Sequence, residues 1–177
     1  TETGRSPSQI WGNHGTACSG IISAKTNNNL GVAGIAPNCP VMSISNQLMG
    51  TSDAPQKRAD GFNWAWRNGA SVISNSWRSS TFSELLEDAI QSAMTNGRNG
   101  LGCVVTFSAG NYDSNTVGYP ARSLPDIIVV GALSLSGKRK SSTTIDNEGW
   151  WGSDYGTQLD IMAPGVLIYT TDRTGSV

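Results

Sequence analysis

The chain carries a single histidine, His14, within the segment GNHGTACSGIISA at residues 12–24. An imidazole ionises close to neutral pH, which suits it to accept and return a proton during catalysis. The residues that follow it are small and then apolar, which predicts a helix over 14–24. Two interpretations are therefore open: a catalytic base at the mouth of a cleft, or a histidine near a helix cap with no catalytic role.

Polar residues also follow two apolar runs further along the chain. Asn75 and Ser76 end the run at 71–76, and the residues from Ser108 to Asn111 end the run at 103–111. In open parallel sheets, function gathers at the carboxyl ends of the strands. A catalytic His14 must therefore reach the same sheet edge as these residues.

The elements that would position these residues alternate between strand and helix. Unbroken apolar runs bounded by glycine are typical of a parallel sheet covered on both faces, and their alternation with helices predicts βαβ units. The last third, from Ser134, is polar and predicts short strands at most. We expect one domain over 1–177 with a three-layer, doubly wound, mostly parallel α/β fold. The expected strands are 41–45, 71–76, 103–111 and 126–133, and the expected helices are 14–24, 54–68 and 82–96.

Local signals mark the ends of two of these helices. Asp53 is the expected N-cap of the helix over 54–68. Thr81 and Glu84 form a capping-box pattern at the start of the helix over 82–96, and Gly97 can close that helix.

Composition excludes several classes of partner. Twelve Lys and Arg residues against thirteen Asp and Glu residues give a net charge of −1, which supplies no field for nucleic acid or an anionic membrane. No apolar run reaches the roughly 18 residues that span a bilayer. No glycine-rich phosphate loop follows a strand and opens a helix, which argues against a nucleotide-binding domain. The polar N-terminus is not a signal peptide, so we expect that a leader was removed or that the chain begins partway through a longer protein.

The three cysteines, Cys18, Cys39 and Cys103, cannot all pair within the chain. No CxxC spacing suggests zinc. Buried free thiols are the default expectation for such residues, and their redox state stays open.

Six segments, in this order, carry a family resemblance: HGTACSGII, LGVAGIAP, VISNSW, VVTFSAGN, TVGYPA and LDIMAPGV. They begin at His14 and end at Val166, and they resemble the signatures of the subtilisin-like serine proteases in a match that spans roughly Gly12 to Val166. The resemblance implies the subtilisin-like α/β fold and peptide-bond hydrolysis through an acyl-enzyme. It also implies a secreted or cell-envelope location and a peptide or unfolded protein as substrate.

The resemblance assigns catalytic roles to two residues. His14 resembles the general base that takes the proton of the serine nucleophile. Asn111 resembles the amide that, with a backbone N–H, stabilises the negative oxygen of the tetrahedral intermediate. An asparagine in an ordinary glycine turn is the alternative for Asn111.

Ser76, Trp77, Arg78 and Ser79 resemble the extended segment that pairs with a bound peptide by β-augmentation. Trp77 and Arg78 depart from the Leu-Gly usual at these positions, which puts fine specificity in doubt. A core or rim aromatic is the alternative for Trp77.

Gly110 and Gly118 match positions that line the pocket for the residue before the cut. No carboxylate occurs among the matched positions. We therefore expect a roomy apolar pocket that does not select Lys or Arg.

Residues 24–34, AKTNNNLGVAG, resemble the family's calcium-binding loop. By position Asn28 offers its side chain, whereas Thr26, Leu30 and Val32 offer backbone carbonyls, which are the hard oxygen donors that calcium prefers. The upstream carboxylate of the family's site is missing, and a plain surface loop is the alternative. Calcium is the one cofactor that the resemblance implies, and we expect no organic cofactor.

The resemblance leaves the triad acid and the nucleophile unassigned. Glu2 matches the acid's setting imperfectly, Ser176 lacks the preceding threonine and the following helix, and Asp160 fits a structural or ion-adjacent role better. We therefore expect the central part of a catalytic domain, truncated at both ends. Such a chain would need the missing N- and C-terminal parts of the same domain and would be inactive alone.

The alternative function is a non-catalytic subtilisin-like domain that binds peptides. An Asp-Ser/Thr-Gly motif upstream and a Gly-Thr-Ser motif downstream in the parent reading frame would favour the protease.

Overall fold

The structure is a computed structural model that describes residues 12–46 and 50–174. The chain divides into two compact units. Thr1–Gln47 and Ile168–Val177 form the smaller unit, and Leu48–Leu167 form the larger one. Each unit is described by itself, and the single domain stays a prediction.

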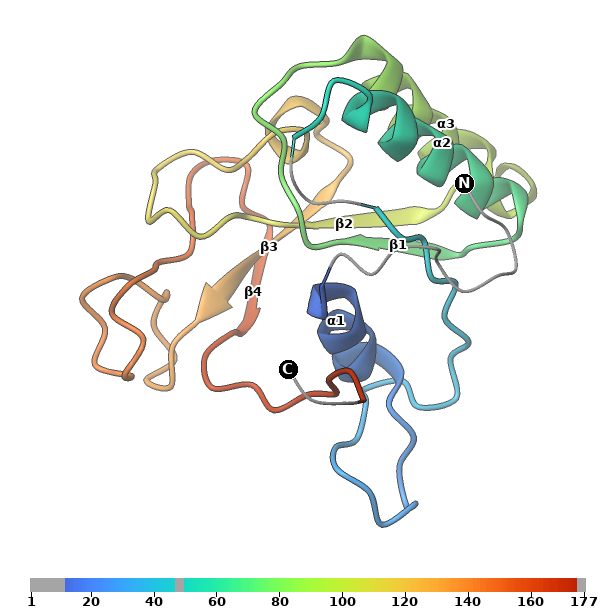
Figure 1. Ribbon diagram of the computed structural model, residues 1–177. Coiled ribbons are helices and arrows are strands. Elements are labelled where there is room, and N and C mark those ends of the chain that lie inside the picture. The colour runs from blue at the N-terminus through green and yellow to red at the C-terminus, as the bar shows by residue number, and fades with distance from the viewer. Residues whose placement is uncertain (1–11, 47–49, 175–177) are drawn as a thin grey trace. The chain divides into compact units, whose positions relative to one another are not determined.

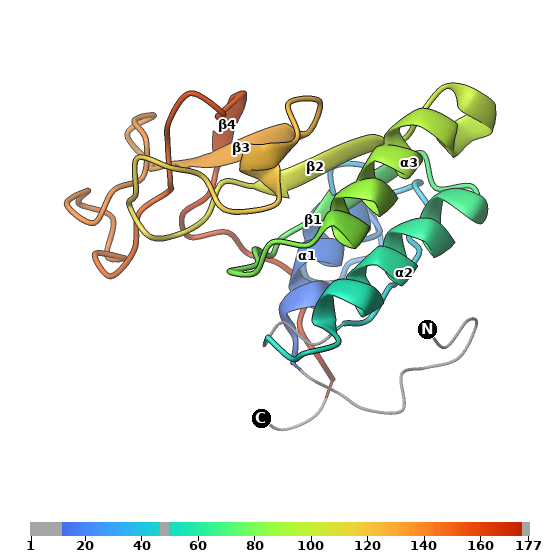
Figure 2. The same ribbon diagram turned by 90° about the horizontal axis from the view of Figure 1, so that it is seen from above.

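The larger unit is built on a parallel sheet with the strand order β1-β2-β3-β4. Two helices, α2 (Ala54–Arg67) and α3 (Glu84–Gly100), lie side by side over one face of this sheet (Figures 1 and 2). The parallel α/β architecture predicted from the sequence is confirmed. The strands are β1 (Val72–Asn75), β2 (Val104–Ser108), β3 (Ile128–Leu133) and β4 (Ile161–Pro164).

The core of this unit lies between the two helices and the sheet. Phe62 of α2 stacks on Phe107 of β2 with ring centroids 6.3 Å apart. Burial of each such side chain contributes about 1.5–3 kcal/mol relative to its exposure. The opposite face of the sheet is more open, because Val72 is 58% and Val104 is 39% exposed. The helices α2 and α3 cover the first face, and a helical layer on the opposite face stays a prediction.

The ends of the helices partly follow the predicted signals. Ser83, with extended backbone, caps α3 and its side chain accepts a hydrogen bond from the Leu86 N–H. Thr81 is therefore not the cap. The backbone leaves helical angles at Gly97, as expected, although a further irregular turn continues to Gly100. Asp53 occupies the N-cap position of α2 but bonds to Thr51 and Lys57 instead of a helix N–H.

The smaller unit contains α1 (His14–Ser23). Thr170 and Thr171 donate hydrogen bonds to the carbonyls of Ala17 and Thr16, so the segment after residue 167 runs against this helix. A Cβ on Gly20 would collide with both threonines, which explains why α1 needs a small residue there. Within residues 12–46 and 50–174, no helix has the length and apolar character needed to cross a bilayer.

The predicted strand over 41–45 is wrong, because the structure assigns no strand to these residues. Val41 is 45% and Met42 is 43% exposed. A strand needs a hydrogen-bonded neighbour, and this segment has no ladder partner among the described residues.

The cysteines differ in their environments, and all three are free. Cys103 is buried as expected, and its thiol donates a hydrogen bond to the Ala70 carbonyl. Burial raises the pKa of this thiol. Cys18 is half-buried, but Cys39 is exposed, so the expectation of buried thiols fails at Cys39.

A buried ion pair organises the loop between β3 and β4. The Lys140 ammonium lies 3.3 Å from the Asp146 carboxylate, and both side chains are almost fully buried. Lys140 also donates to the Ser141 carbonyl and to the Thr144 hydroxyl. These added hydrogen bonds are what a buried pair needs to offset its desolvation.

Candidate active site

The predicted site residues of the larger unit begin at one edge of the sheet. β1 and β2 are parallel neighbours, with Asn75 opposite Phe107. The segments that follow them, 76–79 and 109–112, therefore leave the sheet at the same carboxyl edge. For these residues the expected clustering is confirmed.

Backbone hydrogen bonds join a third segment to these two. The Ser79 N–H donates to the Tyr119 carbonyl at 2.9 Å, and Ser79 and Tyr119 form an antiparallel bridge. The Gly118 N–H donates to the Ala109 carbonyl at 3.0 Å. The structure thus brings the segment 76–79 together with Gly110, Asn111 and Gly118.

The turn that carries Asn111 depends on Gly110. This glycine has a φ of +118°, a conformation that side chains other than hydrogen rarely allow. A Cβ at this position would also collide with the Asp154 carboxylate. Glycine is therefore required both by the backbone and by the side chain packed behind it.

Asp154 holds this turn in place. Its carboxylate is fully buried, and Oδ1 accepts hydrogen bonds from the backbone N–H groups of Tyr112 at 2.8 Å and Ser114 at 3.0 Å. Its own N–H donates to the Gly110 carbonyl at 2.9 Å. Sequence reasoning missed Asp154, because it lies in the polar last third, where no periodicity marks a buried position.

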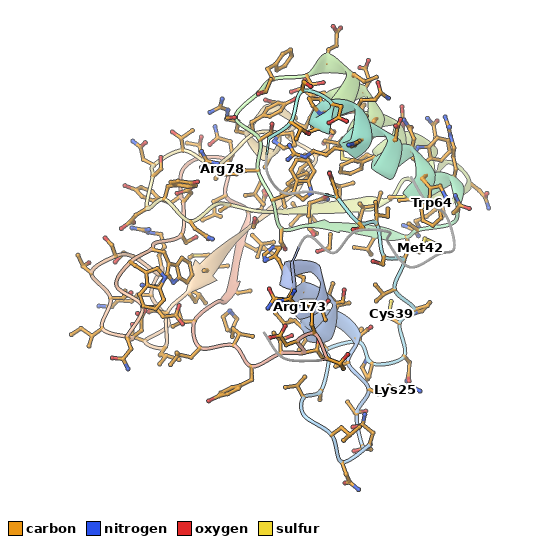
Figure 3. All side chains as sticks on the ribbon, in the orientation of Figure 1. Lys25, Cys39, Met42, Trp64, Arg78 and Arg173 are labelled. Carbon is orange, nitrogen blue, oxygen red and sulfur yellow. The ribbon has the colours of Figure 1, made fainter. Side chains whose placement is uncertain are left out.

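Arg78, which is labelled in Figure 3, lies beside this carboxylate in the segment that follows β1. Its guanidinium lies 3.5 Å from Asp154 Oδ2 and 4.0 Å from the centre of the Tyr112 ring. The space next to Gly118 is taken by the Arg78 stem, since a Cβ on Gly118 would lie 3.0 Å from the Arg78 Cβ. The Asp154 carboxylate thus adjoins Gly110 and the Arg78 stem lies next to Gly118, while the roomy apolar pocket expected at these two glycines stays a prediction.

Trp77 packs at the rim of the core. Its indole N–H donates to the Asn75 side chain at 3.1 Å, and its ring meets the edge of Phe107 at 5.0 Å. The guanidinium of Arg58 lies over the same indole at 4.5 Å. Trp77 therefore links the core to the surface of the segment 76–79, and its contact with a substrate stays a prediction.

The two predicted catalytic residues are both exposed. Asn111 follows the Gly110 turn in the larger unit, and His14 is the first residue of α1 in the smaller unit. The His14 Nε2 lies 3.8 Å from the Cys18 thiol, one helical turn along. Neither residue is enclosed by apolar packing, and their meeting at one site stays a prediction.

The predicted calcium loop supplies neutral oxygens only. The Asn28 side chain accepts a hydrogen bond from the Leu30 N–H at 3.1 Å, and the Gly34 N–H closes the loop on the Ala24 carbonyl. Thr26 is exposed and Val32 half-buried. Residues 24–34 contain no carboxylate, and the described residues hold no cluster of three metal-ligating His, Cys, Asp or Glu side chains. This donor set fits a weak calcium site at most.

Three residues were considered for the triad acid or nucleophile, and only Asp160 lies within the described residues. Asp160 Oδ2 accepts the Val129 N–H at 2.7 Å and so binds the sheet, in line with its predicted structural role. Glu2 and Ser176 lie outside the described residues.

A parallel α/β sheet with polar turns at its carboxyl edge defines the large class of α/β proteins whose sites lie at that edge. Within that class the chain belongs to the subtilase family, whose model matches residues 1–177.

Several individual proteins are similar to the chain. A calcium-dependent protease of Trichormus variabilis is 33% identical over 93% of this chain and 26% of the relative. Subtilisin NAT of Bacillus subtilis subsp. natto is 34% identical over 93% of this chain and 40% of the relative. The solved structure of the prenylagaramide maturation protease PagA superposes with a TM-score of 0.67 at 26% identity, covering 92% of this chain and 55% of that one. The chain thus spans about a quarter to a half of these relatives.

A second carboxylate, Asp113, supports the same turn. Arg139 forms an ion pair with it at 2.6 Å, and the N–H and hydroxyl of Ser142 donate to its other oxygen at 2.9 and 2.8 Å. The backbone hydrogen bond from Ser142, followed by the bond from Arg139, lowers the pKa of Asp113 to about 2.

We predict that Gly110→Ala destabilises the protein more than Gly137→Ala. Both glycines have positive φ, but a Cβ on Gly137 meets open space. Backbone strain alone costs about 1 kcal/mol at Gly137, whereas strain and collision together cost about 3 kcal/mol or more at Gly110. Urea unfolding of both variants measures the difference. Equal losses in the free energy of unfolding would show that the Asp154 carboxylate can move away from the new methyl group without destabilising the protein.

We also predict that Asp113 contributes to stability against acid. Its folded pKa of about 2 lies below the usual 3.8, so its contribution is complete above the usual value and is lost as the pH falls from 3.8 to about 2. Asp113→Asn should lower the free energy of unfolding at neutral pH and flatten its decline across that window. The same change at exposed Asp126 is the control. If the free energy of unfolding of wild type and of Asp113→Asn declined in parallel between pH 3.8 and about 2, the prediction would be contradicted.

Proposed function

We propose that the chain is part of a subtilisin-type serine endopeptidase that hydrolyses peptide bonds through an acyl-enzyme. The observation that carries this proposal is the exposed Asn111 amide, on a turn held by Gly110 and Asp154, beside an extended segment able to bind peptide backbone. Membership of the subtilase family and the protease names of its relatives support it.

In this proposal His14 accepts the proton of a serine hydroxyl as that oxygen attacks the peptide carbonyl carbon. It then delivers the proton to the leaving amine, and a water molecule repeats the sequence to release the acyl group. Asn111 and a backbone N–H donate to the carbonyl oxygen as its negative charge develops. The segment from Ser76 to Ser79 holds the peptide extended across these groups.

The serine nucleophile and the aspartate have no assigned counterpart among these 177 residues. We therefore propose that both come from other parts of the same catalytic domain, and that the 177 residues do not hydrolyse peptides alone. A secreted or cell-envelope location belongs to the same proposal and rests on the family.

A peptide-binding domain without catalysis is the second candidate. The observation in its favour is that Arg78, in place of the family's usual glycine, covers Gly118 where a substrate side chain would enter. This candidate keeps the extended segment but assigns no proton transfer to His14.

We predict that the intact parent protein reacts with a fluorophosphonate probe and that His14→Ala abolishes the reaction, because the serine then lacks its base. Asn111→Ala should slow peptide hydrolysis by about a hundredfold or more, the size known for one oxyanion donor in a subtilisin. Asn115→Ala, in the same exposed loop, is the matched control and should leave the rate unchanged. Gel fluorescence and steady-state kinetics give these readouts.

Labelling that persists in the His14→Ala parent would overturn the assignment of the base. A folded parent that binds peptides but takes no label would favour the binding domain. Hydrolysis by the 177 residues alone would contradict the proposed division of the triad.

We further propose that residues 24–34 bind calcium weakly. Calcium should raise the unfolding temperature of the parent by mass action, and Asn28→Ala should reduce the increase because one oxygen ligand is lost. Asn27→Ala, at the neighbouring exposed position, is the control. The experiment is a thermal unfolding series in calcium and, for comparison, in magnesium. An increase that Asn28→Ala leaves intact would place the ion elsewhere.

A further inference from the structure

A pocket of about 320 Å³ lies in the larger unit, between the start of α2 and the segment that follows β1. Arg58 of α2 and Arg78 both line it, together with Ser79 and Tyr112. No acidic residue is among its lining residues. In Figure 3, Arg78 lies toward the N-terminal end of α2, and Trp64 lies toward the C-terminal end of that helix. The wall of the pocket is therefore cationic in a chain whose net charge is −1.

Arg58 is a buried cation without a counter-ion. Only 6% of the residue is exposed, and it forms no ion pair within the described residues. Its Nε is buried and has no hydrogen-bond partner. Burial lowers the pKa of its guanidinium, yet arginine stays charged at neutral pH. Because an unpaired buried charge is costly, an anion entering the pocket would be bound favourably.

Both guanidinium groups are held by aromatic rings. Arg58 lies 4.5 Å from the Trp77 ring centre, and Arg78 lies 4.0 Å from the Tyr112 ring centre. A stacked guanidinium uses its flat face and keeps its N–H edge for a planar anion. A carboxylate has the shape to accept two such N–H groups at once.

The N-terminus of α2 adds to this preference. Ala54 and Pro55, in its first turn, line the pocket. The Ala54 N–H donates to the Thr51 carbonyl and Pro55 has no N–H, so the helix contributes through the positive end of its dipole, which attracts negative charge. Asp53, the acidic residue directly before the helix, is engaged with Lys57 and Thr51 and makes no side-chain cap to α2.

We propose that this pocket binds the carboxylate of an acidic residue in the peptide substrate, so that the enzyme prefers Asp or Glu at one position along the bound peptide. The inference rests on the proposed endopeptidase function and adds the substrate class that this chain selects. Arg58 and Arg78 are its specificity determinants. Asp154 lies beneath Arg78 at 3.5 Å, but two of its hydrogen bonds run to the backbone of the Asn111 turn, and it fixes that arginine in place.

The test uses the parent protease and a set of fluorogenic peptides. Each position around the cleaved bond carries Glu in one peptide and Gln in its partner, so that only charge differs. One position should show kcat/KM about tenfold or more higher for Glu, as expected for hydrogen bonds to a charged group. Arg58→Met should bring this ratio close to one, and Arg58→Lys should restore part of it. Arg67→Met is the matched control, since Arg67 lies on the same helix, is exposed and stacks on Trp66 at 5.2 Å outside the pocket.

Equal rates for Glu and Gln at every position would overturn the proposal while leaving the protease intact. A Glu preference that survives Arg58→Met would also overturn it. If Arg58→Met does not fold, Arg78→Met removes the more exposed of the two guanidinium groups and should lower the Glu preference at the selected position, and an unchanged preference would contradict the proposal. If the parent cleaves no peptide, calorimetry measures the binding of the same Glu and Gln peptide pairs. Tighter binding of one Glu peptide than of its Gln partner would support carboxylate binding in the pocket, and equal binding of every pair would overturn it.

Discussion

The candidate site depends on one close approach, that of the Asp154 carboxylate to the backbone turn at Gly110. A buried carboxylate is costly unless it is hydrogen-bonded, and Oδ1 of this one accepts the N–H groups of Tyr112 and Ser114. Its Oδ2 has no hydrogen-bond partner among the described residues and lies 3.5 Å from the Arg78 guanidinium. Only a glycine leaves room for the carboxylate at the centre of the turn. The backbone turn that carries the exposed Asn111 is therefore held by a side chain from a segment about 40 residues away in the chain.

The same carboxylate connects the turn to the peptide-binding segment. Arg78 faces Asp154 on one side and stacks on Tyr112, the residue that follows Asn111. A change in any of these groups would shift both the Asn111 turn and the segment from Ser76 to Ser79. Under the proposed function, catalytic positioning and substrate selection would thus share one support, because the buried charge that holds the turn also holds the arginine.

The sequence predicted those features that depend on neighbours along the chain. The break in α3 at Gly97 and the existence of the strands β2 and β3 follow from local residue patterns. The cap of α3 was placed two residues early, because the choice of Ser83 depends on where the backbone becomes extended. The run at 41–45 has strand-like composition but no ladder partner among the described residues. The role of Asp154 could not be predicted from the sequence, because its hydrogen-bond partners are distant along the chain and no helix or strand periodicity marks it as a buried residue.

The charge of the pocket shows why a family resemblance predicts backbone roles better than specificity. The segment around Ser76 and Gly118 pairs through main-chain groups, which tolerate many side chains. In the proposed function, specificity comes instead from the side chains above that backbone, and two arginines line the pocket between the start of α2 and the segment after β1. The net charge of −1 gives no indication of them, since screening confines each charge to roughly 10 Å and only the local arrangement acts on a bound residue. If the proposed function holds, a protein that shares the backbone of its relatives would select a different class of peptide through two guanidinium groups and the rings that hold them.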